Sequence, residues 1–309
     1  MTQRREGSDI QAVWLAHVAL ALAALFWSGN FVAGRALREA VDPVTLNTLR
    51  WGLALVLFLP FALPVCLRNA DQIRRHWRLL LGLGATGVAG FQTIVYAALA
   101  QTTATNALLV LAFIPVTILI GSALMGDTRP GRLQWAGSGL SLVGVGVLIT
   151  RADIEVIRNL SFNPGDLWIL VAVVLWSVYS LLLRRRPPEL SQQVTLAVSM
   201  VVGFVILLPV WVVTAPSARL ELSLEVGAII GYLVLFPSLL SFWLWSQGVA
   251  RVGPEKAGQF IHLMPIFGSA LAVVILGERI GMPQVLGALI VFAGIAAVVR
   301  GQARRAETA

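Results

Sequence analysis

Several polar and aromatic side chains lie at helical spacing inside long apolar stretches, where side chains capable of chemistry are rare. They form the pairs Trp27 with Asn30, Gln92 with Tyr96, Trp176 with Tyr179 and Gln259 with His262, and a further stretch carries Trp243 and Trp245. Residues three or four apart share one face of a helix, so both members of a pair point the same way. Amides exchange hydrogen bonds with ammonium and carboxylate groups, and aromatic faces attract apolar or cationic groups. This chemistry is the reversible binding of a small amphipathic molecule.

Each of these residues also has a structural explanation that the sequence leaves open. The amides and tyrosines could form hydrogen bonds that hold helices together. Trp243 and Trp245 could face lipid, and His262 could be a satisfied interior histidine rather than a proton relay. Arg50, within the second apolar stretch, could contact a substrate carboxylate or extend its charged end towards the membrane surface. Pro115 and Pro265 interrupt two apolar stretches and favour a bend, so we expect a hinge at each.

The sequence contains no motif for catalysis or for a bound cofactor. It lacks a Gly-rich loop ending in Lys-Ser or Lys-Thr, a Gly-x-Ser-x-Gly elbow and a His-Glu-x-x-His metal site. The Asp and Glu residues fall in tails, connections or helix ends, and only His262 could carry a proton at membrane depth. We therefore expect no enzyme activity, no cofactor and no metal, and movement of a solute down its own gradient.

The composition predicts an all-α integral membrane protein. The chain of 309 residues is 58% hydrophobic and 12% charged, whereas soluble domains are about 25% charged. Apolar stretches of roughly 20 residues, long enough to cross a bilayer as helices, recur along it. We predict ten spans, at Val13–Ala33, Thr45–Leu67, Leu79–Ala100, Ala104–Met125, Leu133–Ile149, Asp166–Leu183, Val194–Thr214, Val226–Ala250, Gly258–Leu276 and Pro283–Val299.

The basic residues explain the net charge of +8 through membrane topology. With a cytoplasmic amino terminus, most of them fall in cytoplasmic segments, including the clusters Arg74–Arg75, Arg184–Arg186 and Arg304–Arg305. This is the asymmetry of the positive-inside rule, and it predicts that both termini are cytoplasmic. We therefore expect lipid and a small-molecule substrate as partners, and no nucleic acid.

The two halves of the chain resemble each other at an offset of about 150 residues. The segment Phe26–Ser28 matches Leu175–Ser177, Ile114–Pro115 matches Met264–Pro265, and Gly126–Asp127 matches Gly277–Glu278. Each half holds five predicted spans, an odd number, so the second copy must be inverted in the membrane. We divide the chain into a tail (1–12), a first repeat (13–150), a connecting loop (151–165), a second repeat (166–299) and a C-terminal tail (300–309).

Inverted repeats predict alternating access, because two bundles of opposite orientation can exchange conformations around a central site. The expected function is therefore transport through a cavity between the repeats. A structural or receptor-like membrane subunit without transport is the alternative from another class.

The repeat, the mid-span prolines with their Gly-acid pairs and the Trp-Ser-Gly-Asn string at Trp27–Asn30 resemble the drug/metabolite transporter superfamily, in its EamA-type branch. Within it the chain is similar to bacterial aromatic amino acid exporters. The resemblance implies an inner-membrane protein that exports small metabolites or facilitates their diffusion. We expect amino acids, aromatic ones first, as substrates and a monomer as the functional unit, with broad drug or cation efflux as the second possibility.

Overall fold

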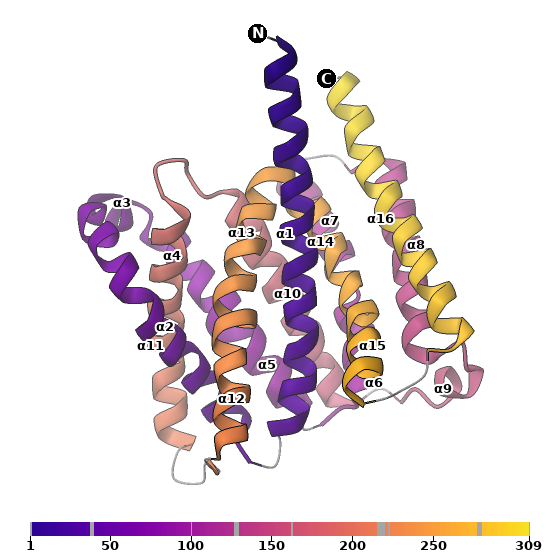
Figure 1. The fold of residues 1–309 in the computed structure, drawn as a ribbon, viewed down its shortest axis with the longest axis horizontal. Coiled ribbons are helices and arrows are strands. Elements are labelled where there is room, and N and C mark those ends of the chain that lie inside the picture. The colour runs from indigo at the N-terminus through magenta and orange to yellow at the C-terminus, as the bar shows by residue number, and fades with distance from the viewer. Residues whose placement is uncertain are drawn as a thin grey trace.

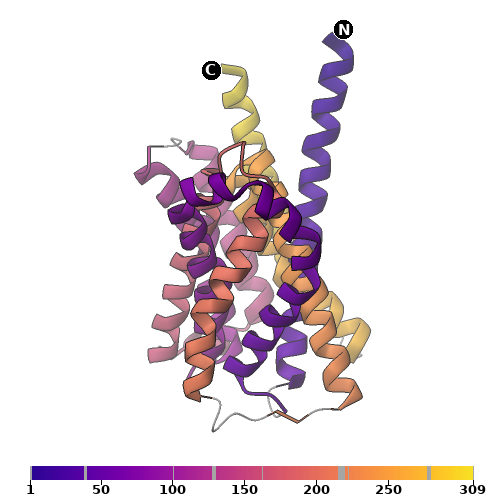
Figure 2. The ribbon, with the colours of Figure 1, turned by 90° about the vertical axis from the view of Figure 1, so that its left-hand side faces the viewer.

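The computed structural model describes residues 2–37, 40–99, 101–126, 130–161, 163–214, 220–221, 223–276 and 280–308. These residues form a bundle of long helices with both termini at the same end (Figure 1, Figure 2). Extended pairing in this part of the chain is confined to an isolated bridge between Val41 and Leu220. The all-helical class predicted from composition is confirmed.

The first repeat contains a run of helices that several breaks divide. They are α1 (Thr2–Leu37), α2 (Pro43–Arg68), α3 (Ala70–Arg75), α4 (Trp77–Leu83), the π-helix η1 (Gly84–Gly90), α5 (Phe91–Ala98), α6 (Ala104–Leu111), α7 (Ile114–Leu124) and α8 (Arg132–Thr150). Side-chain caps fix the starts of two of them. The Asp42 carboxylate accepts hydrogen bonds from the first backbone N–H groups of α2, and the Thr103 hydroxyl caps α6.

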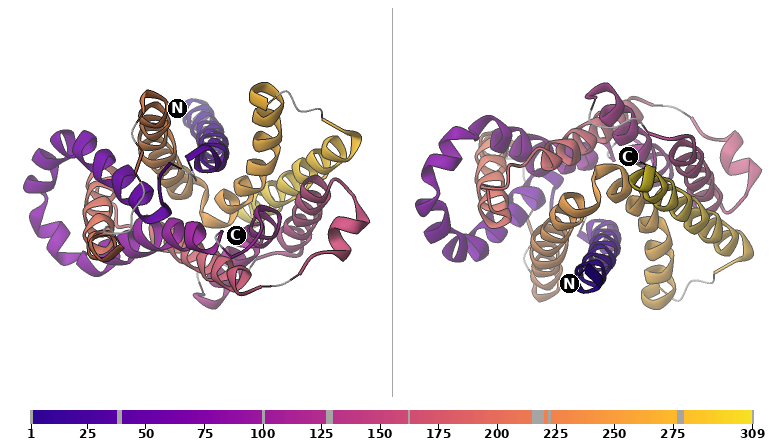
Figure 3. Two further views of the ribbon diagram at one scale, coloured as in Figure 1. Left: turned by 90° about the horizontal axis from the view of Figure 1, so that it is seen from below. Right: turned by 90° about the horizontal axis from the view of Figure 1, so that it is seen from above.

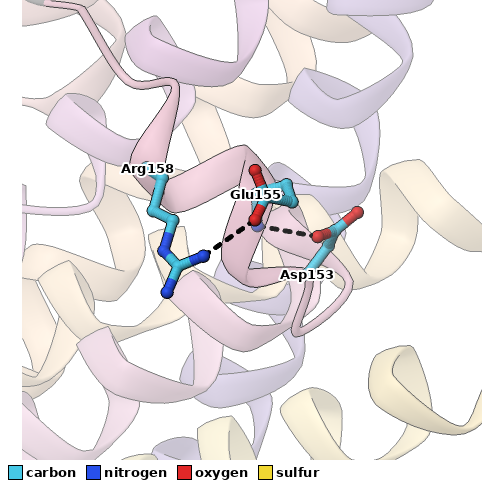
Figure 4. A network of polar contacts seen from close by, with 3 residues as sticks. All are labelled: Asp153, Glu155 and Arg158. Carbon is cyan, nitrogen blue, oxygen red and sulfur yellow. Dashed lines mark hydrogen bonds and ion pairs between the residues drawn. The ribbon is translucent and has the colours of Figure 1, made fainter.

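The second repeat has the same order of elements. After the short α9 (Ile154–Arg158) come α10 (Pro164–Arg184), α11 (Gln192–Thr214), α12 (Leu224–Leu233), the π-helix η3 (Val234–Leu240), α13 (Ser241–Val252), α14 (Pro254–Gln259), the 3₁₀ turn η4 (Phe260–His262), α15 (Leu263–Leu276) and α16 (Met282–Thr308). Exposed α9 is ordered locally, with Glu155 paired to Arg158 at 2.9 Å and its backbone N–H capped by Asp153 (Figure 4).

Nine stretches among the described residues are long and apolar enough to cross a membrane. They correspond to the predicted spans except Gly258–Leu276, which the structure divides into α14, η4 and α15. In Figure 1, α13 ends near the termini and α16 begins at the opposite end, so this divided segment runs through the bundle between them. The protein is therefore a multi-pass membrane protein, and a tenth crossing stays a prediction.

Equivalent backbone features mark the two repeats. The π-helices η1 and η3 begin at residues 84 and 234, at the offset of about 150 found in the sequence. Gln134 accepts a hydrogen bond from the Gly131 N–H at 2.7 Å, and Gln284 accepts one from the Gly281 N–H at 3.0 Å. The matched acids Asp127 and Glu278 lie outside the described residues.

Small residues join the repeats where α8 crosses α16. The two helices lie next to each other along one lateral side of the bundle, and α2 packs against α11 on the opposite side (Figure 3). A Cβ atom on Gly144 would lie 2.7 Å from the Val291 backbone nitrogen, and one on Gly137 would lie 2.7 Å from the Gly294 carbonyl oxygen. Close approach of helix backbones in lipid depends on such residues.

Substitution of Gly144 tests this contact. Gly144→Val should destabilise the fold by about 1–3 kcal/mol, because its side chain would overlap the backbone of α16. Gly139→Val is the matched control on the same helix, since nothing lies within 4 Å of a Cβ atom there. Thermal unfolding in detergent should show a lower melting temperature for Gly144→Val alone, and equal melting of both variants would contradict the account.

Candidate functional site

A small, partly enclosed cavity lies between the two repeats. Its walls come from α1, α5, α6, α7 and α8 of the first repeat and from α10, α13, η4 and α15 of the second. Among the predicted site residues it is lined by Trp27, Asn30, Gln92, Trp176, His262 and Pro265. The structure therefore brings together residues that are up to 238 positions apart in the sequence, through the packing of the two repeats.

One wall of the cavity is aromatic, and Trp176 stands at its centre. The ring centroid of Trp176 lies 4.8 Å from that of Phe91, 5.0 Å from Trp27 and 5.7 Å from Phe242. Trp245 closes the cluster from behind, 5.4 Å from Trp27 and 5.6 Å from Trp176. Edge-to-face and tilted contacts of this kind fix ring positions and leave a rigid apolar surface.

Two equivalent tryptophans in this wall differ in their hydrogen bonding. The Trp27 indole N–H donates to the Pro237 carbonyl in η3 at 3.0 Å. The Trp176 indole N–H is buried and finds no partner among the described residues. The position in η1 that matches Pro237 is Gly87, and the Tyr179 ring packs against it. The two equivalent tryptophans thus have different surroundings in the two repeats.

Arg50 lies behind the cavity wall and joins helices of both repeats. Its Nε donates to the Ser238 hydroxyl at 2.5 Å, and its Nη1 donates to the Asn30 side-chain oxygen at 3.3 Å. The Tyr96 hydroxyl donates to the same Asn30 oxygen at 3.1 Å. Arg50 is 1% exposed, so its side chain does not extend to the membrane surface, the alternative that its position near a helix end had left open.

His262 in η4 and Gln259 at the end of α14 each form a hydrogen bond to a serine of α8. The His262 Nε2 donates to the Ala112 carbonyl at 2.7 Å, and its Nδ1 lies 2.6 Å from the Ser141 hydroxyl. The Gln259 amide nitrogen donates to the Ser138 hydroxyl at 2.8 Å. Both ring nitrogens of His262 are therefore engaged, which fits the interior-histidine interpretation better than a free proton relay.

Several predicted site residues do not line the cavity themselves. Tyr96 and Arg50 both donate hydrogen bonds to Asn30, and Tyr179 and Trp245 contact the Trp176 ring. Gln259 is fully buried, and the half-buried Trp243 packs against Phe58 at 6.3 Å, away from the cavity. Sequence reasoning missed Phe91 and Phe242, which line the cavity, although Phe91 directly precedes the recognised Gln92.

The two prolines lie at breaks in equivalent helices. Pro115 is the second residue of α7, just after the turn that separates it from α6. Pro265 is the third residue of α15, just after the 3₁₀ turn η4. Pro265 lines the cavity, and so do residues of the two turns, Ala112 before α7 and His262 in η4. Pro115 is buried beside Gly258. A change of angle at either break would alter the shape of the cavity wall.

An ion pair connects the helices at the end of the bundle where the termini lie. The Arg184 guanidinium, at the end of α10, lies 2.7 Å from the Glu255 carboxylate at the start of α14. Glu255 is 1% exposed, so the pair is shielded from solvent on its acidic side. Partial burial lowers the pKa of the neighbouring Lys256, and Glu255 acts in the opposite direction.

Comparison with known proteins decides the class of this fold. The model of the EamA-like transporter family matches residues 14–150 and again 163–300, once for each half of the chain. The chain belongs to the EamA-like transporter family. Its members are transporters, and the twofold repeat, the cavity and the long apolar helices agree with that class.

Curated relatives of this EamA-family chain cover most of its length. It is 28% identical to the uncharacterized transporter YyaM of Bacillus subtilis, over 82% of this chain and 83% of the relative. It is 26% identical to a probable terminal-alkyne amino-acid exporter of Streptantibioticus cattleyicolor, over 96% and 97%. A chain of known crystal structure superposes with a TM-score of 0.78 at 23% identity, covering 94% of this chain and 98% of that one, which shows the shared fold.

Proposed function

We propose that this EamA-family protein exports amino acids, or facilitates their diffusion, across the bacterial inner membrane, with aromatic amino acids as the first candidates. The observation that carries the proposal is the cavity between the repeats, which has an aromatic wall around Trp176 and polar groups at Asn30, Gln92 and His262. An aromatic side chain would pack on the wall, while its ammonium and carboxylate groups would exchange hydrogen bonds with the amides. The relation to a probable amino-acid exporter supports this substrate class.

Transport would occur by alternating access between the two inverted repeats. The unequal tryptophans support this mechanism. Trp27 bonds to η3, whereas burial of the Trp176 N–H without a partner costs roughly 1–3 kcal/mol. In the opposite conformation Trp176 would bond to η1 as Trp27 now bonds to η3, and the cost would pass from one repeat to the other. Such an exchange gives two states of similar free energy, with Pro115 and Pro265 at the breaks where helices would bend.

The membrane topology that we propose has ten spans, both termini in the cytoplasm and a functional monomer. The termini lie at one end of the bundle, as an even number of crossings requires (Figure 1). The excess of basic residues in segments at that end supports its cytoplasmic location. The Arg184–Glu255 pair would then close the cytoplasmic side of the bundle.

Uptake into proteoliposomes tests the proposed function. Purified protein should give saturable uptake of radiolabelled aromatic amino acids without an imposed pH gradient, because no acidic residue among the described ones lines the cavity. Empty liposomes are the control. Uptake that requires a pH gradient would contradict the facilitator mechanism, and absence of uptake for aromatic, small and charged amino acids would contradict the substrate class.

Two variants test polar contacts that support the cavity wall. Tyr96→Ala removes one of two donors that hold Asn30, and Gln259→Ala removes the contact to Ser138, so each should lower the uptake rate by about tenfold if its lost hydrogen bond is worth 1.4 kcal/mol in transport. Gln193→Ala, which loses a contact on the outer surface to the Phe61 carbonyl, is the matched control. Normal uptake kinetics from both of these variants, with equal protein in the vesicles, would refute a role of Tyr96 and Gln259 in transport.

A further inference from the structure

Arg50 is a cation at membrane depth without a carboxylate beside it. Its guanidinium contacts the neutral Ser238 and Asn30, and lies 5.2 Å from the Trp51 ring centroid. No ion pair to Arg50 occurs among the described residues. A buried charge is normally paired or lies at a functional site, because removal from water is costly. The positive charge of Arg50 is therefore not neutralised by a described carboxylate, and a bound anion could neutralise it.

The buried acidic residues of the described chain are committed elsewhere. Glu255 pairs with Arg184 near the cytoplasmic end. Asp166 accepts hydrogen bonds from Thr102, from the Asn106 amide at 3.2 Å and from the Asn163 backbone at 3.0 Å. Neither carboxylate contacts Arg50. The buried acidic residues of the described chain therefore do not neutralise its charge.

Asn30 connects the Arg50 charge to the cavity. Its side-chain oxygen accepts from both Arg50 and Tyr96, and Asn30 itself lines the cavity. With the oxygen held by these two donors, the amide nitrogen of Asn30 is the group left to donate, and it makes no hydrogen bond within the described residues. A donor backed by a guanidinium is the arrangement that favours an anionic acceptor.

We propose that Arg50 and Asn30 form a carboxylate-selecting end of the cavity, so that the protein carries zwitterionic or anionic amphipathic molecules and rejects amines that lack a carboxylate. This inference rests on the proposed function and names the feature of the substrate that the site requires. The carboxylate accepts from the Asn30 amide with the Arg50 charge behind it, and the rest of the molecule packs on the aromatic wall. It separates amino acid transport from efflux of cations, which the Arg50 charge would repel.

Tryptophan and tryptamine are the matched probes, because they differ only in the carboxylate. Uptake of each is measured in proteoliposomes, and the readout is the ratio of their initial rates at equal concentration. Wild-type protein should prefer tryptophan by about ten- to hundredfold, the range expected for one hydrogen bond to a charged group.

Variants of Arg50 then locate the origin of this preference. Arg50→Gln removes the charge and should bring the ratio close to one, mainly by slowing tryptophan. Arg50→Lys keeps the charge but loses the planar guanidinium that donates to Ser238 and Asn30 at the same time, so it should retain part of the preference. Asn47→Ala is the control, since it removes a buried hydrogen bond to Thr93 one turn earlier on α2 without a change of charge. Its ratio should equal that of the wild type, whatever its stability.

The outcomes separate the inference from the proposed function. Uptake of tryptophan with the same ratio in wild type and Arg50→Gln would overturn the role of Arg50 and leave amino acid transport intact. Preference of the wild type for tryptamine would overturn the inference in favour of cation efflux. Wild-type protein that moves neither probe nor any other amino acid would overturn the proposed function and the inference with it. If Arg50→Gln does not fold, Arg50→Lys decides the question: a tryptophan-to-tryptamine ratio below that of Asn47→Ala supports the role of Arg50, and a ratio equal to that of Asn47→Ala overturns it.

Discussion

Polar groups that lie at membrane depth are stabilised by partners inside the protein, because lipid offers none. In this bundle, that constraint determines which helices meet. Arg50 on α2 reaches Ser238 in η3 and Asn30 on α1, His262 reaches Ala112 and Ser141, and Trp27 reaches the Pro237 carbonyl. Each of these contacts joins distant segments, and the cavity is the space that they enclose.

The π-helices contribute to this arrangement because their geometry changes which carbonyls are accessible. In η3, Ser238 donates to the Leu233 carbonyl and accepts from Arg50, while Pro237 lacks an N–H and its carbonyl accepts from Trp27. In η1, the matching position is Gly87, covered by Tyr179. The two repeats thus share the π-helix at equivalent positions but differ in the residues that it contacts.

The sequence was sufficient to predict the helical class, the repeat and the cavity residues Trp27, Asn30, Gln92, Trp176 and His262, since period, hydropathy and intramembrane polarity are local signals. It could not identify the hydrogen-bond partners of Arg50, because these come from two other elements, α1 and η3, and depend on how the repeats pack. Helix geometry places residues two apart on nearly opposite faces, but it could not show which of Trp243 and Trp245 would pack against Trp176. The π-helices gave no local signal that we recognised, and the ten spans, the domain boundaries and the site roles stay predictions.

The central claim, that the cavity between the repeats is the substrate path, is tested most directly by substrate protection of a cysteine placed in it. In a Cys66→Ser background, Leu108→Cys on the cavity wall is compared with Leu140→Cys, which is 42% exposed on the outer surface of α8. A water-soluble thiol reagent should block uptake through Leu108→Cys, excess substrate should slow the block, and Leu140→Cys should stay active. Block of Leu108→Cys that substrate does not slow, or no block at all, would contradict the account.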